Sequence, residues 1–315
     1  MIEQFKKDVD LGLSKDPKHL NSKYFYDDIG DKLFIQIMHA PEYYLTRSEF
    51  EIFEEQTQEI INAFGIDKST YFELIELGAG DGTKTKELLK VLNKESYSFD
   101  YMPIDISKDV LNVLEQSLKL ELPEINVKTK QGDYFEVLES LKSTNHPKVV
   151  LFLGSNLGNL SDERAAEFIY KLGSNLHPND KLLLGVDLIK SASVVLPAYN
   201  DKAGVTREFN LNLLRRMNRE LGANFNLEQF EHTPEYTEEE GIAKSFLTSQ
   251  VEQKVSIASI GKTYHFKAGE KIHTEISRKY SDQVVSHIFN DTDFKQVKKL
   301  TDSKGYFADY IFTRL

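Results

Sequence analysis

Between residues 71 and 188, short apolar runs alternate with amphipathic stretches, and this alternation constrains the fold more than any other feature of the chain. The amphipathic stretches carry apolar residues at helical spacing, as in "TKTKELLKVL". Strands that alternate with helices predict a parallel sheet covered on both faces, which is an α/β fold. The apolar runs are "YFELIEL", "FDYMPID", "VVLFLGS" and "KLLLGVDL".

Three glycines, Gly78, Gly80 and Gly82, stand between the first of these strands and the helix that follows it. Glycine adopts positive φ without strain and lets a ligand approach the backbone. A bare turn from strand to helix rarely needs three glycines. Because ligands of such sheets bind at the carboxyl ends of the strands, this loop predicts a cofactor site.

The spacing of the glycines indicates which cofactor the loop holds. A dinucleotide fingerprint reads Gly-x-Gly-x-x-Gly, but here the third glycine comes one position early and Thr83 occupies the expected place. Asp81 would also bring a carboxylate close to two phosphates. A cofactor without phosphate fits better, and S-adenosylmethionine (SAM) is such a molecule.

Two further acids follow the next strands in sequence. Asp105 ends "YMPID", where a carboxylate can accept hydrogen bonds from both ribose hydroxyls. Asp133, in "KTKQGDYF", is placed to meet the adenine edge, although a helix cap is an equally good interpretation of this residue. The order of these strand ends favours one SAM site. A nicotinamide-dependent oxidoreductase and a catalytically silent binding module remain as alternatives.

The alternating pattern ends after Leu188, which predicts two domains. We expect a core from residues 51–190 and 278–315, and a second domain with a small sheet of its own from residues 191–277. Within the second domain, "KSFLTSQVEQKVSI" and "KTYHFKAGEKIHTEI" have the pattern of strands. Near the C-terminus, a turn from Asp302 to Gly305 predicts a hairpin that returns to the main sheet.

A helix is predicted from "LTRSEFEIFEEQTQEIINAF". Thr46 is expected to be its N-cap, with Glu49 three residues later completing a capping box. Leu45 is placed to pack on Phe50 as a hydrophobic staple.

Composition narrows the classes of partner. The net charge of -11 and the pI near 5.3 argue against nucleic acid, which needs clustered Lys and Arg. The chain has no Cys, and none of its eight His forms a His-x-x-x-His pair, so a metal site is not expected. No signal-peptide or membrane-spanning pattern is present. We expect a cytoplasmic protein, a small-molecule partner, and a monomer in preference to an oligomer.

Several stretches together resemble the SAM-dependent L-histidine Nα-methyltransferases of ergothioneine biosynthesis, over nearly the whole chain. This family has a Rossmann-like class I methyltransferase core and a second, α+β substrate-binding domain. The resemblance implies that residues 51–190 and 278–315 form the core, and that residues 1–50 join residues 191–277 in the substrate domain. The stretches are "YFYDDIGDKLFIQIMHAPEYYLTR", "ELGAGDGTKT", "LFLGSNLGNL", "GVDLIK", "PAYNDKAGVTREFN" and "FKAGEKIHTEISRKYS".

The resemblance implies roles for individual residues. Tyr43 and Asn159 would lie near the substrate amino group and act in catalysis, while Tyr199 would hold the substrate carboxylate. Glu275 and Ser277 would hold the imidazole ring. Three more residues complete the assignment: Tyr26 lines the substrate pocket, and Lys84 and Gly154 belong to the cofactor site.

The chain departs from the family at two places. Ser245 stands where the histidine enzymes carry an apolar methionine that packs on the substrate, so a same-family enzyme for tryptophan or tyrosine is an alternative. The glycine loop of the family more often reads Gly-Ser-Gly-Thr-Ser, whereas Asp81 and Gly82 follow Gly80 here. Because the backbone makes the contacts in this loop, we expect cofactor binding to survive the change.

The resemblance implies N-methylation of histidine, up to the trimethylated betaine hercynine. Methyl transfer is an in-line displacement in which a neutral amine attacks the methyl carbon and a thioether leaves. Positioning supplies most of the acceleration, and the amine must be able to lose its proton. Aromatic faces, including the tyrosines named above, would tolerate the cation that grows with each methyl group.

Overall fold

The structure, a computed structural model, describes residues 2–315 and divides into two compact units. The accessory unit comprises the described residues up to Tyr44 and the segment Lys190–Arg278. The core unit comprises Leu45–Ile189 and Lys279–Leu315. Each unit is therefore built from two segments that are distant in the sequence.

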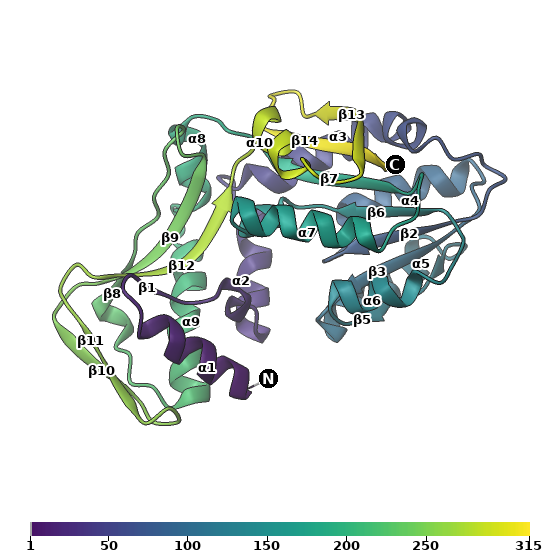
Figure 1. The fold of residues 1–315 in the computed structure, drawn as a ribbon. Coiled ribbons are helices and arrows are strands. Elements are labelled where there is room, and N and C mark those ends of the chain that lie inside the picture. The colour runs from purple at the N-terminus through teal and green to yellow at the C-terminus, as the bar shows by residue number, and fades with distance from the viewer. Residues whose placement is uncertain (1) are drawn as a thin grey trace. The chain divides into compact units, whose positions relative to one another are not determined.

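The core unit contains one sheet of eight strands, in the order β13-β14-β7-β6-β2-β3-β4, with β5 also paired to β3 (Figure 1). Strands β2 to β7 are parallel to one another, and β2 and β6 are buried at every residue. The predicted parallel sheet is confirmed, and its buried strands explain the near-continuous apolar runs. The parallel strands are β2 (Phe72–Leu77), β3 (Phe99–Asp105), β4 (Asn126–Val127), β5 (Lys130–Gln131), β6 (Lys148–Phe152) and β7 (Lys181–Asp187).

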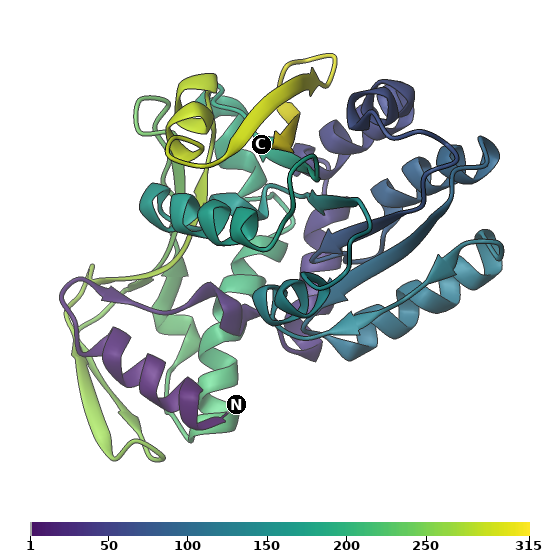
Figure 2. The same cartoon turned by 45° about the vertical axis from the view of Figure 1, so that its right-hand side comes forward.

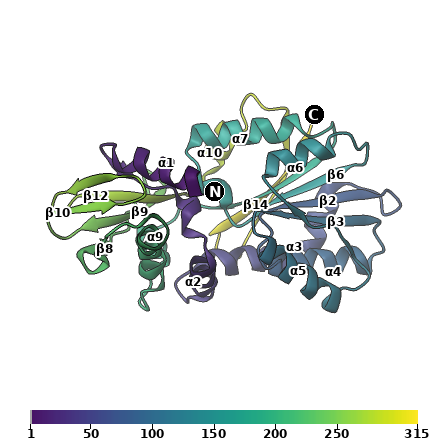
Figure 3. The same ribbon diagram turned by 90° about the horizontal axis from the view of Figure 1, so that it is seen from below.

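Helices cover both faces of this sheet, as Figure 3 shows. Apolar side chains of α3, α4 and α5 form one buried cluster with one face of the strands, and those of α6, α7 and α10 form another with the opposite face. The layers are those expected of a doubly wound α/β fold. The helices are α3 (Tyr44–Phe64), α4 (Thr83–Lys94), α5 (Lys108–Glu121), α6 (Tyr134–Leu141), α7 (Asp162–Ser174) and α10 (Asp282–Ile288).

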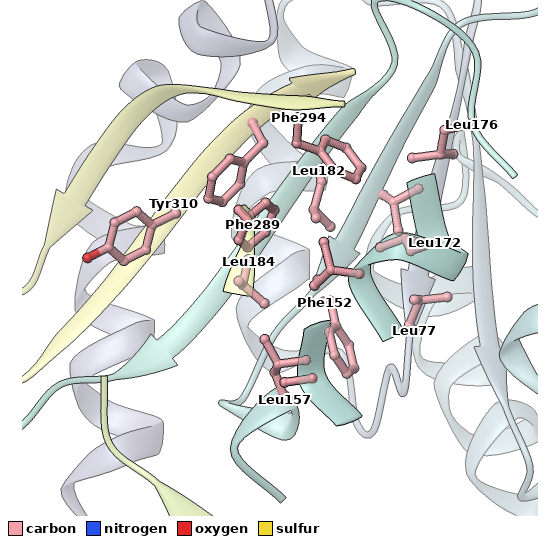
Figure 4. Close-up of a cluster of buried hydrophobic side chains, with 14 of the residues drawn as sticks. Leu77, Phe152, Leu157, Leu172, Leu176, Leu182, Leu184, Phe289, Phe294 and Tyr310 are labelled. Carbon is pink, nitrogen blue, oxygen red and sulfur yellow. The ribbon is translucent and has the colours of Figure 1, made fainter. Parts of the chain in front are cut away.

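The cluster beneath α7 and α10 shows how closely the core is packed (Figure 4). Phe152 and Leu184 come from neighbouring strands of the sheet, and Leu172 comes from α7. Phe289 stacks on Phe312 with ring centroids 3.8 Å apart and an angle of 6° between the planes. Burial of this apolar surface fixes the helices on the sheet.

The predicted C-terminal hairpin is confirmed. β13 (Phe294–Thr301) and β14 (Phe307–Arg314) are antiparallel, and Gly305 in the turn between them has φ of +64°. β14 also pairs with β7 in antiparallel register, so the hairpin extends the main sheet. The chain therefore closes the edge that β7 would otherwise expose.

The accessory unit has a sheet of its own, in the order β1-β12-β9-β8, and a separate two-stranded ribbon of β10 and β11. β8, β9 and β12 are antiparallel, whereas β1 pairs parallel to β12. The strands are β1 (Lys18–His19), β8 (Phe230–His232), β9 (Ile242–Ser249), β10 (Gln253–Ile257), β11 (Lys262–Phe266) and β12 (Lys271–Arg278).

The helix α9 (Val205–Leu221) is the centre of the accessory unit and ends at Gly222 in a left-handed C-cap. The N-terminal helix α1 (Ile2–Leu13) packs beside α9, and in Figure 2 it is the purple helix next to the green one. The guanidinium of Arg216 on α9 lies 5.2 Å from the ring centroid of Phe5 on α1. The remaining elements are η1 (Ser22–Phe25), α2 (Asp28–His39), α8 (Ala192–Ala198) and η3 (Leu227–Gln229).

The predicted capping box at the start of α3 is wrong. The helix begins at Tyr44, so Thr46 lies inside it and cannot be its N-cap, and Leu45 is likewise inside and not a staple to Phe50. Glu49 is fully buried and accepts hydrogen bonds from another part of the core unit. The local pattern is overridden because the apolar face of the helix continues to the N-terminal side of Thr46.

His232 on β8 is a buried titratable group in the accessory unit. Neither ring nitrogen has a hydrogen-bond partner among the described residues. Burial lowers the pKa of His232 to about 4, although the charge of Asp201 opposes this shift. The folded chain therefore holds this imidazole in its neutral form near pH 7.

We expect the free energy of unfolding to fall as the pH falls from 6.5 to 4. In this window the unfolded chain protonates His232 and the folded chain does not, which costs up to about 3 kcal/mol. Denaturant unfolding of wild type and His232→Leu at several pH values measures this. The difference in stability between the two proteins should shift in favour of the variant as the pH falls. His265→Leu, at an exposed position of β11, serves as the control, and a pH-independent difference for His232→Leu would contradict the prediction.

Candidate active site

The glycine loop connects β2 to α4 and has the backbone conformation that its sequence predicts. Gly78, Gly80 and Gly82 have φ of +74°, +55° and +68°. The Asp81 carboxylate has a partner within the loop, because it accepts a hydrogen bond from Thr83 N–H at the start of α4 (3.0 Å). All three positions are left-handed, which confirms the prediction that this turn needs the conformational freedom of glycine.

The surroundings of the three glycines differ. A Cβ atom on Gly78 would lie 2.7 Å from the Tyr134 hydroxyl, and one on Gly82 would lie 2.5 Å from Cδ1 of Leu114. A Cβ atom on Gly80 would meet nothing within 4 Å. At the first and third positions, a Cβ atom would displace the end of the Tyr134 or the Leu114 side chain. The open space at Gly80 is where a ligand has access to the backbone.

Asp105 lies at the end of β3, as predicted. Its Oδ1 accepts a hydrogen bond from Ser107 N–H (2.9 Å). Burial raises the pKa of Asp105, while backbone N–H groups of Ser107, Ile106 and Gly80 act in the opposite direction. The carboxylate keeps an acceptor position beyond these bonds, so it can accept a hydrogen bond from a ribose hydroxyl, and its contact with both hydroxyls stays a prediction.

Asp133 is exposed and is the N-cap of α6, where its carboxylate accepts a hydrogen bond from Phe135 N–H (2.9 Å). The helix-cap interpretation of this residue is therefore confirmed. Its contact with an adenine edge stays a prediction, which the cap does not exclude because a carboxylate accepts several hydrogen bonds.

Gly154 follows β6 with φ of +73° and lies among donors of other segments. A Cβ atom on Gly154 would lie 3.7 Å from Nζ of Lys84 and 3.7 Å from Nδ2 of Asn156. The same amide nitrogen lies 3.5 Å from the Cβ position of Gly78. Two nitrogen donors thus converge beside two strand ends, an arrangement suited to a carboxylate.

Sequence reasoning missed Asn156 and Tyr134 at this site. The signal was available, since Asn156 lies two residues after Gly154 and Tyr134 directly follows Asp133. Burial raises the pKa of Tyr134, and the charges of Asp105 and Asp133 raise it further, so its hydroxyl is neutral and able to donate a hydrogen bond.

Charged side chains are buried directly beneath the loop. Glu49 accepts hydrogen bonds from Gly154 N–H at both carboxylate oxygens (2.9 and 3.0 Å) and forms an ion pair with Lys84. Glu76 on β2 accepts hydrogen bonds from the hydroxyls of Thr85 (2.8 Å) and Tyr101. Burial raises the pKa of Glu76 to about 7.

The accessory unit brings together four of the predicted substrate residues. The Tyr199 hydroxyl donates a hydrogen bond to Ser277 Oγ (2.7 Å). Glu275 and Ser277 are two positions apart on β12, and Glu275 pairs directly with Ser245 of β9. Alternate residues of a strand point to the same face, so the Glu275 and Ser277 side chains share one face with Ser245.

Tyr26 and Tyr43 belong to an aromatic cluster of the accessory unit. The ring centroid of Phe34 lies 5.7 Å from that of Tyr26 and 6.5 Å from that of Tyr43. Phe209 of α9 lies 5.8 Å from Tyr26 and 5.9 Å from Phe34. Sequence reasoning missed Phe34 and Phe209. Several aromatic faces at one place favour the binding of an organic cation.

Asn159 belongs to the core unit and is exposed at the end of the short helix η2 (Asn156–Asn159). Ser155, just before η2, has φ of +58°, and its hydroxyl accepts a hydrogen bond from Asp187 N–H (3.0 Å). A left-handed residue other than glycine costs of order 1–3 kcal/mol and is typical of functional sites. The proposed contact of Asn159 with a substrate amine stays a prediction.

Two further properties of the described residues bear on function. Residues 2–315 contain no group of three or more His, Asp or Glu side chains arranged to hold a metal ion. None of the helices in this range is both long and apolar enough to cross a membrane.

The fold and the strand-end site define a class of protein. The sheet is parallel and is continued by an antiparallel hairpin. At its carboxyl edge, the glycine loop has open space at Gly80 and an acid ends β3, which are features that suit the binding of SAM. The core unit therefore has the Rossmann-like fold of class I methyltransferases.

Comparison with known proteins identifies the family. Residues 5–314 match the family described as "Histidine-specific methyltransferase, SAM-dependent". A histidine N-alpha-methyltransferase of Mycolicibacterium smegmatis is 37% identical over 97% of this chain and 94% of that protein. One of Mycobacterium tuberculosis is 35% identical over 96% and 92%. Ergothioneine biosynthesis protein 1 of Schizosaccharomyces pombe is 30% identical over 94% of this chain and 39% of that protein. The chain belongs to the histidine-specific, SAM-dependent methyltransferase family.

Substitution of Gly80 tests whether the open space of the loop receives the cofactor. Gly80→Ala should destabilise the protein by about 1–2 kcal/mol because of its positive φ. It should also lower the affinity for SAM about tenfold or more, because the new methyl group occupies space that the ligand needs. Thermal unfolding and calorimetric titration with SAM measure the two effects.

Gly305→Ala is the matched control, since Gly305 also has positive φ and nothing within 4 Å of its Cβ position but lies in the β13–β14 turn. This variant should lose similar stability and keep its affinity for SAM. Equal affinities for SAM in wild type and Gly80→Ala would place the ligand elsewhere.

Proposed function

We propose that this protein transfers methyl groups from SAM to the α-amino group of L-histidine, three times in succession, to give hercynine in ergothioneine biosynthesis. The observation that carries the proposal is the grouping of Tyr199, Ser245, Glu275 and Ser277 in the accessory unit. We assign this unit to the amino acid and the core unit to SAM. Membership of the histidine-specific family supports both assignments.

The core unit supplies the contacts to SAM, whose electrophilic methyl group is the chemistry that the cofactor brings. Gly78, Gly80 and Gly82 expose the backbone of the loop, and Asp105 accepts hydrogen bonds from the ribose. The adenine is assigned to Asp133. Lys84, Gly154 and Asn156 are assigned to the amino-acid part of SAM. The reason is that the side-chain nitrogens of Lys84 and Asn156 are donors that lie beside Gly154.

The hydrogen bond between Tyr199 and Ser277 supports an imidazole as the bound ring. Ser277 accepts from Tyr199, and we assign the proton of its own hydroxyl to the bare ring nitrogen. Glu275 is an acceptor. One acceptor and one donor on the same strand face match a neutral imidazole, which has one N–H and one bare nitrogen. Tyr199 is also assigned to the substrate carboxylate, so binding requires it to share or exchange its bond with Ser277.

The amine is assigned to Tyr43 and Asn159. These groups orient the nitrogen by hydrogen bonds, and neither carries a negative charge that would stabilise an ammonium ion. Alignment of the attacking nitrogen is the main contribution that we assign to them. The aromatic cluster of Tyr26, Phe34, Tyr43 and Phe209 supports repeated transfer, because aromatic faces stabilise the methylated cation.

A second candidate is methylation of a larger aromatic amino acid such as tryptophan or tyrosine. Ser245 motivates it, since this small residue is buried directly opposite Glu275. Serine in place of methionine leaves more room beside the ring and removes an apolar contact. We further propose that the enzyme acts as a cytoplasmic monomer, for which the net charge of -11 and the cysteine-free composition are the support.

Mass spectrometry distinguishes the two candidates. The purified protein is incubated with SAM and each common amino acid in separate reactions, and the products are examined for one, two or three added methyl groups. Histidine should be the preferred acceptor and should accumulate the trimethylated product. Preference for tryptophan or tyrosine would replace the first proposal by the second, and no methylated amino acid at all would contradict both.

Glu275→Ala tests the assignment of the ring. This variant should use histidine about ten- to a hundredfold less well, because it loses a charge-assisted hydrogen bond of about 1.5–3 kcal/mol. Tryptophan and phenylalanine should lose less or gain, because an apolar ring no longer has to desolvate a carboxylate. Wild type and variant are compared by kcat/KM for the three amino acids at saturating SAM. Equal losses for all of them would refute the imidazole contact.

A further inference from the structure

The buried charges beneath the glycine loop include an acid that the proposed reaction does not use. Asp309 on β14 is fully buried, and neither of its carboxyl oxygens has a hydrogen-bond partner among the described residues. An unpartnered buried carboxylate is costly, so its persistence in the core needs a physical reason.

The position of Asp309 relative to Glu49 provides that reason. A Cβ atom on Gly185 of β7 would lie 2.1 Å from Oε1 of Glu49 and 2.9 Å from Oδ1 of Asp309. The two carboxyl groups therefore converge on the same glycine, whose missing side chain makes room for them. β14 lies beside β7 in the sheet (Figure 1), and in this pairing Asp309 is directly opposite Gly185.

Two carboxyl groups that converge on one buried position repel each other when both are charged, which favours the state in which one of them keeps its proton. Glu49 carries the charge, because it pairs with Lys84 and accepts both hydrogen bonds from Gly154 N–H. Asp309 is then the protonated partner. Burial and the Glu49 charge together raise the pKa of Asp309 well above its ordinary value.

Lys84 depends on this charge. Burial alone would lower the pKa of Lys84, but the Glu49 carboxylate raises it above its ordinary value. The charged and titratable groups that face Lys84 are Glu49 from α3, Glu76 from β2 and Asp309 from β14. Glu76 is itself held by the hydroxyls of Thr85 and Tyr101.

We propose that Glu49 and Asp309 form a buried carboxyl pair that carries one proton and one negative charge, and that this charge holds Lys84 and the Gly154 amide in the cofactor site. Glu49 and Asp309 are thus positioning residues for SAM and do not touch the reacting atoms. The proposal rests on the proposed function in taking Lys84 and Gly154 as contacts to SAM.

A shared proton makes a specific prediction for isosteric variants. In Glu49→Gln, Asp309 is released from its charged neighbour and ionises in its place, so Lys84 keeps a counter-ion. In Asp309→Asn, a neutral acid is replaced by a neutral amide and Glu49 stays charged. Each single variant should therefore weaken SAM binding by no more than about threefold at pH 7.

The double variant Glu49→Gln/Asp309→Asn removes the charge of the pair. Its affinity for SAM should fall about thirtyfold or more at pH 7, well beyond the product of the single effects. The loss should deepen from pH 7 to pH 9, because Lys84 without this counter-ion loses its proton more easily. Wild type and both single variants should show a flatter profile.

Calorimetric titration of the full chain with SAM, from pH 6 to pH 9, measures these affinities. Thermal unfolding without SAM shows whether each variant folds, and the isosteric amides are chosen to keep the packing. Glu115→Gln, which breaks an exposed ion pair with Lys119 on α5, is the control for loss of a surface charge.

The outcomes separate the two levels of inference. The shared proton would be contradicted if the losses of SAM affinity in the two single variants multiplied to give the loss in the double variant. It would also be contradicted if the affinity of the double variant had the same pH profile as that of wild type. A wild-type protein that does not bind SAM would instead overturn the cofactor assignment. Lys84→Met should remove the pH dependence from every background, and a dependence that survives it would also contradict the proposal.

Discussion

The structure of the site follows from one constraint on the backbone, which must turn away from a fully buried parallel sheet at the carboxyl ends of β2 and β6. Left-handed residues make both turns, beginning at Gly78 and Gly154. Because Gly78 has no side chain, the Tyr134 hydroxyl can approach the end of β2, and the Asn156 amide and the Lys84 ammonium lie beside Gly154. The same turns therefore provide the space and the donors that we assign to the cofactor.

Several charged side chains are buried around these turns, and a contribution to stability does not explain why they are there. Lys279 and Asp187 form a fully buried ion pair (2.8 Å) at the end of β7, and the Asp187 N–H group donates a hydrogen bond to Ser155 beside the second turn. Replacing buried ion pairs by apolar side chains is often neutral or stabilising, so their presence here is poor evidence for stabilisation. Their location at the strand ends connects them with the geometry of the loops.

The fold of the core unit could be predicted because its strands are short, buried on both faces and separated by amphipathic helices, all of which are local patterns. The role of Glu49 could not, since its partner Gly154 lies 105 residues away and the local sequence resembles a capping box. The helix α6 is only eight residues long, so the possible cap at Asp133 was its one sign in the sequence. Local spacing correctly predicted a left-handed glycine loop between β2 and α4, but not the side chains that other segments bring to it.

The arrangement of the proposed substrate residues could be predicted from the sequence only in part. Period-two alternation along β12 places Glu275 and Ser277 on one face, but the opposite position of Ser245 depends on a register that shifts between His273 and Glu275. The bond from Tyr199 spans 78 residues and has no local signal. In the structure this bond makes Ser277 an acceptor toward Tyr199, and we assign its own proton to the substrate ring. With the Glu275 carboxylate beside it, the proposed pair is complementary to a neutral imidazole, which is the dominant form of the ring above its ordinary pKa of about 6.5.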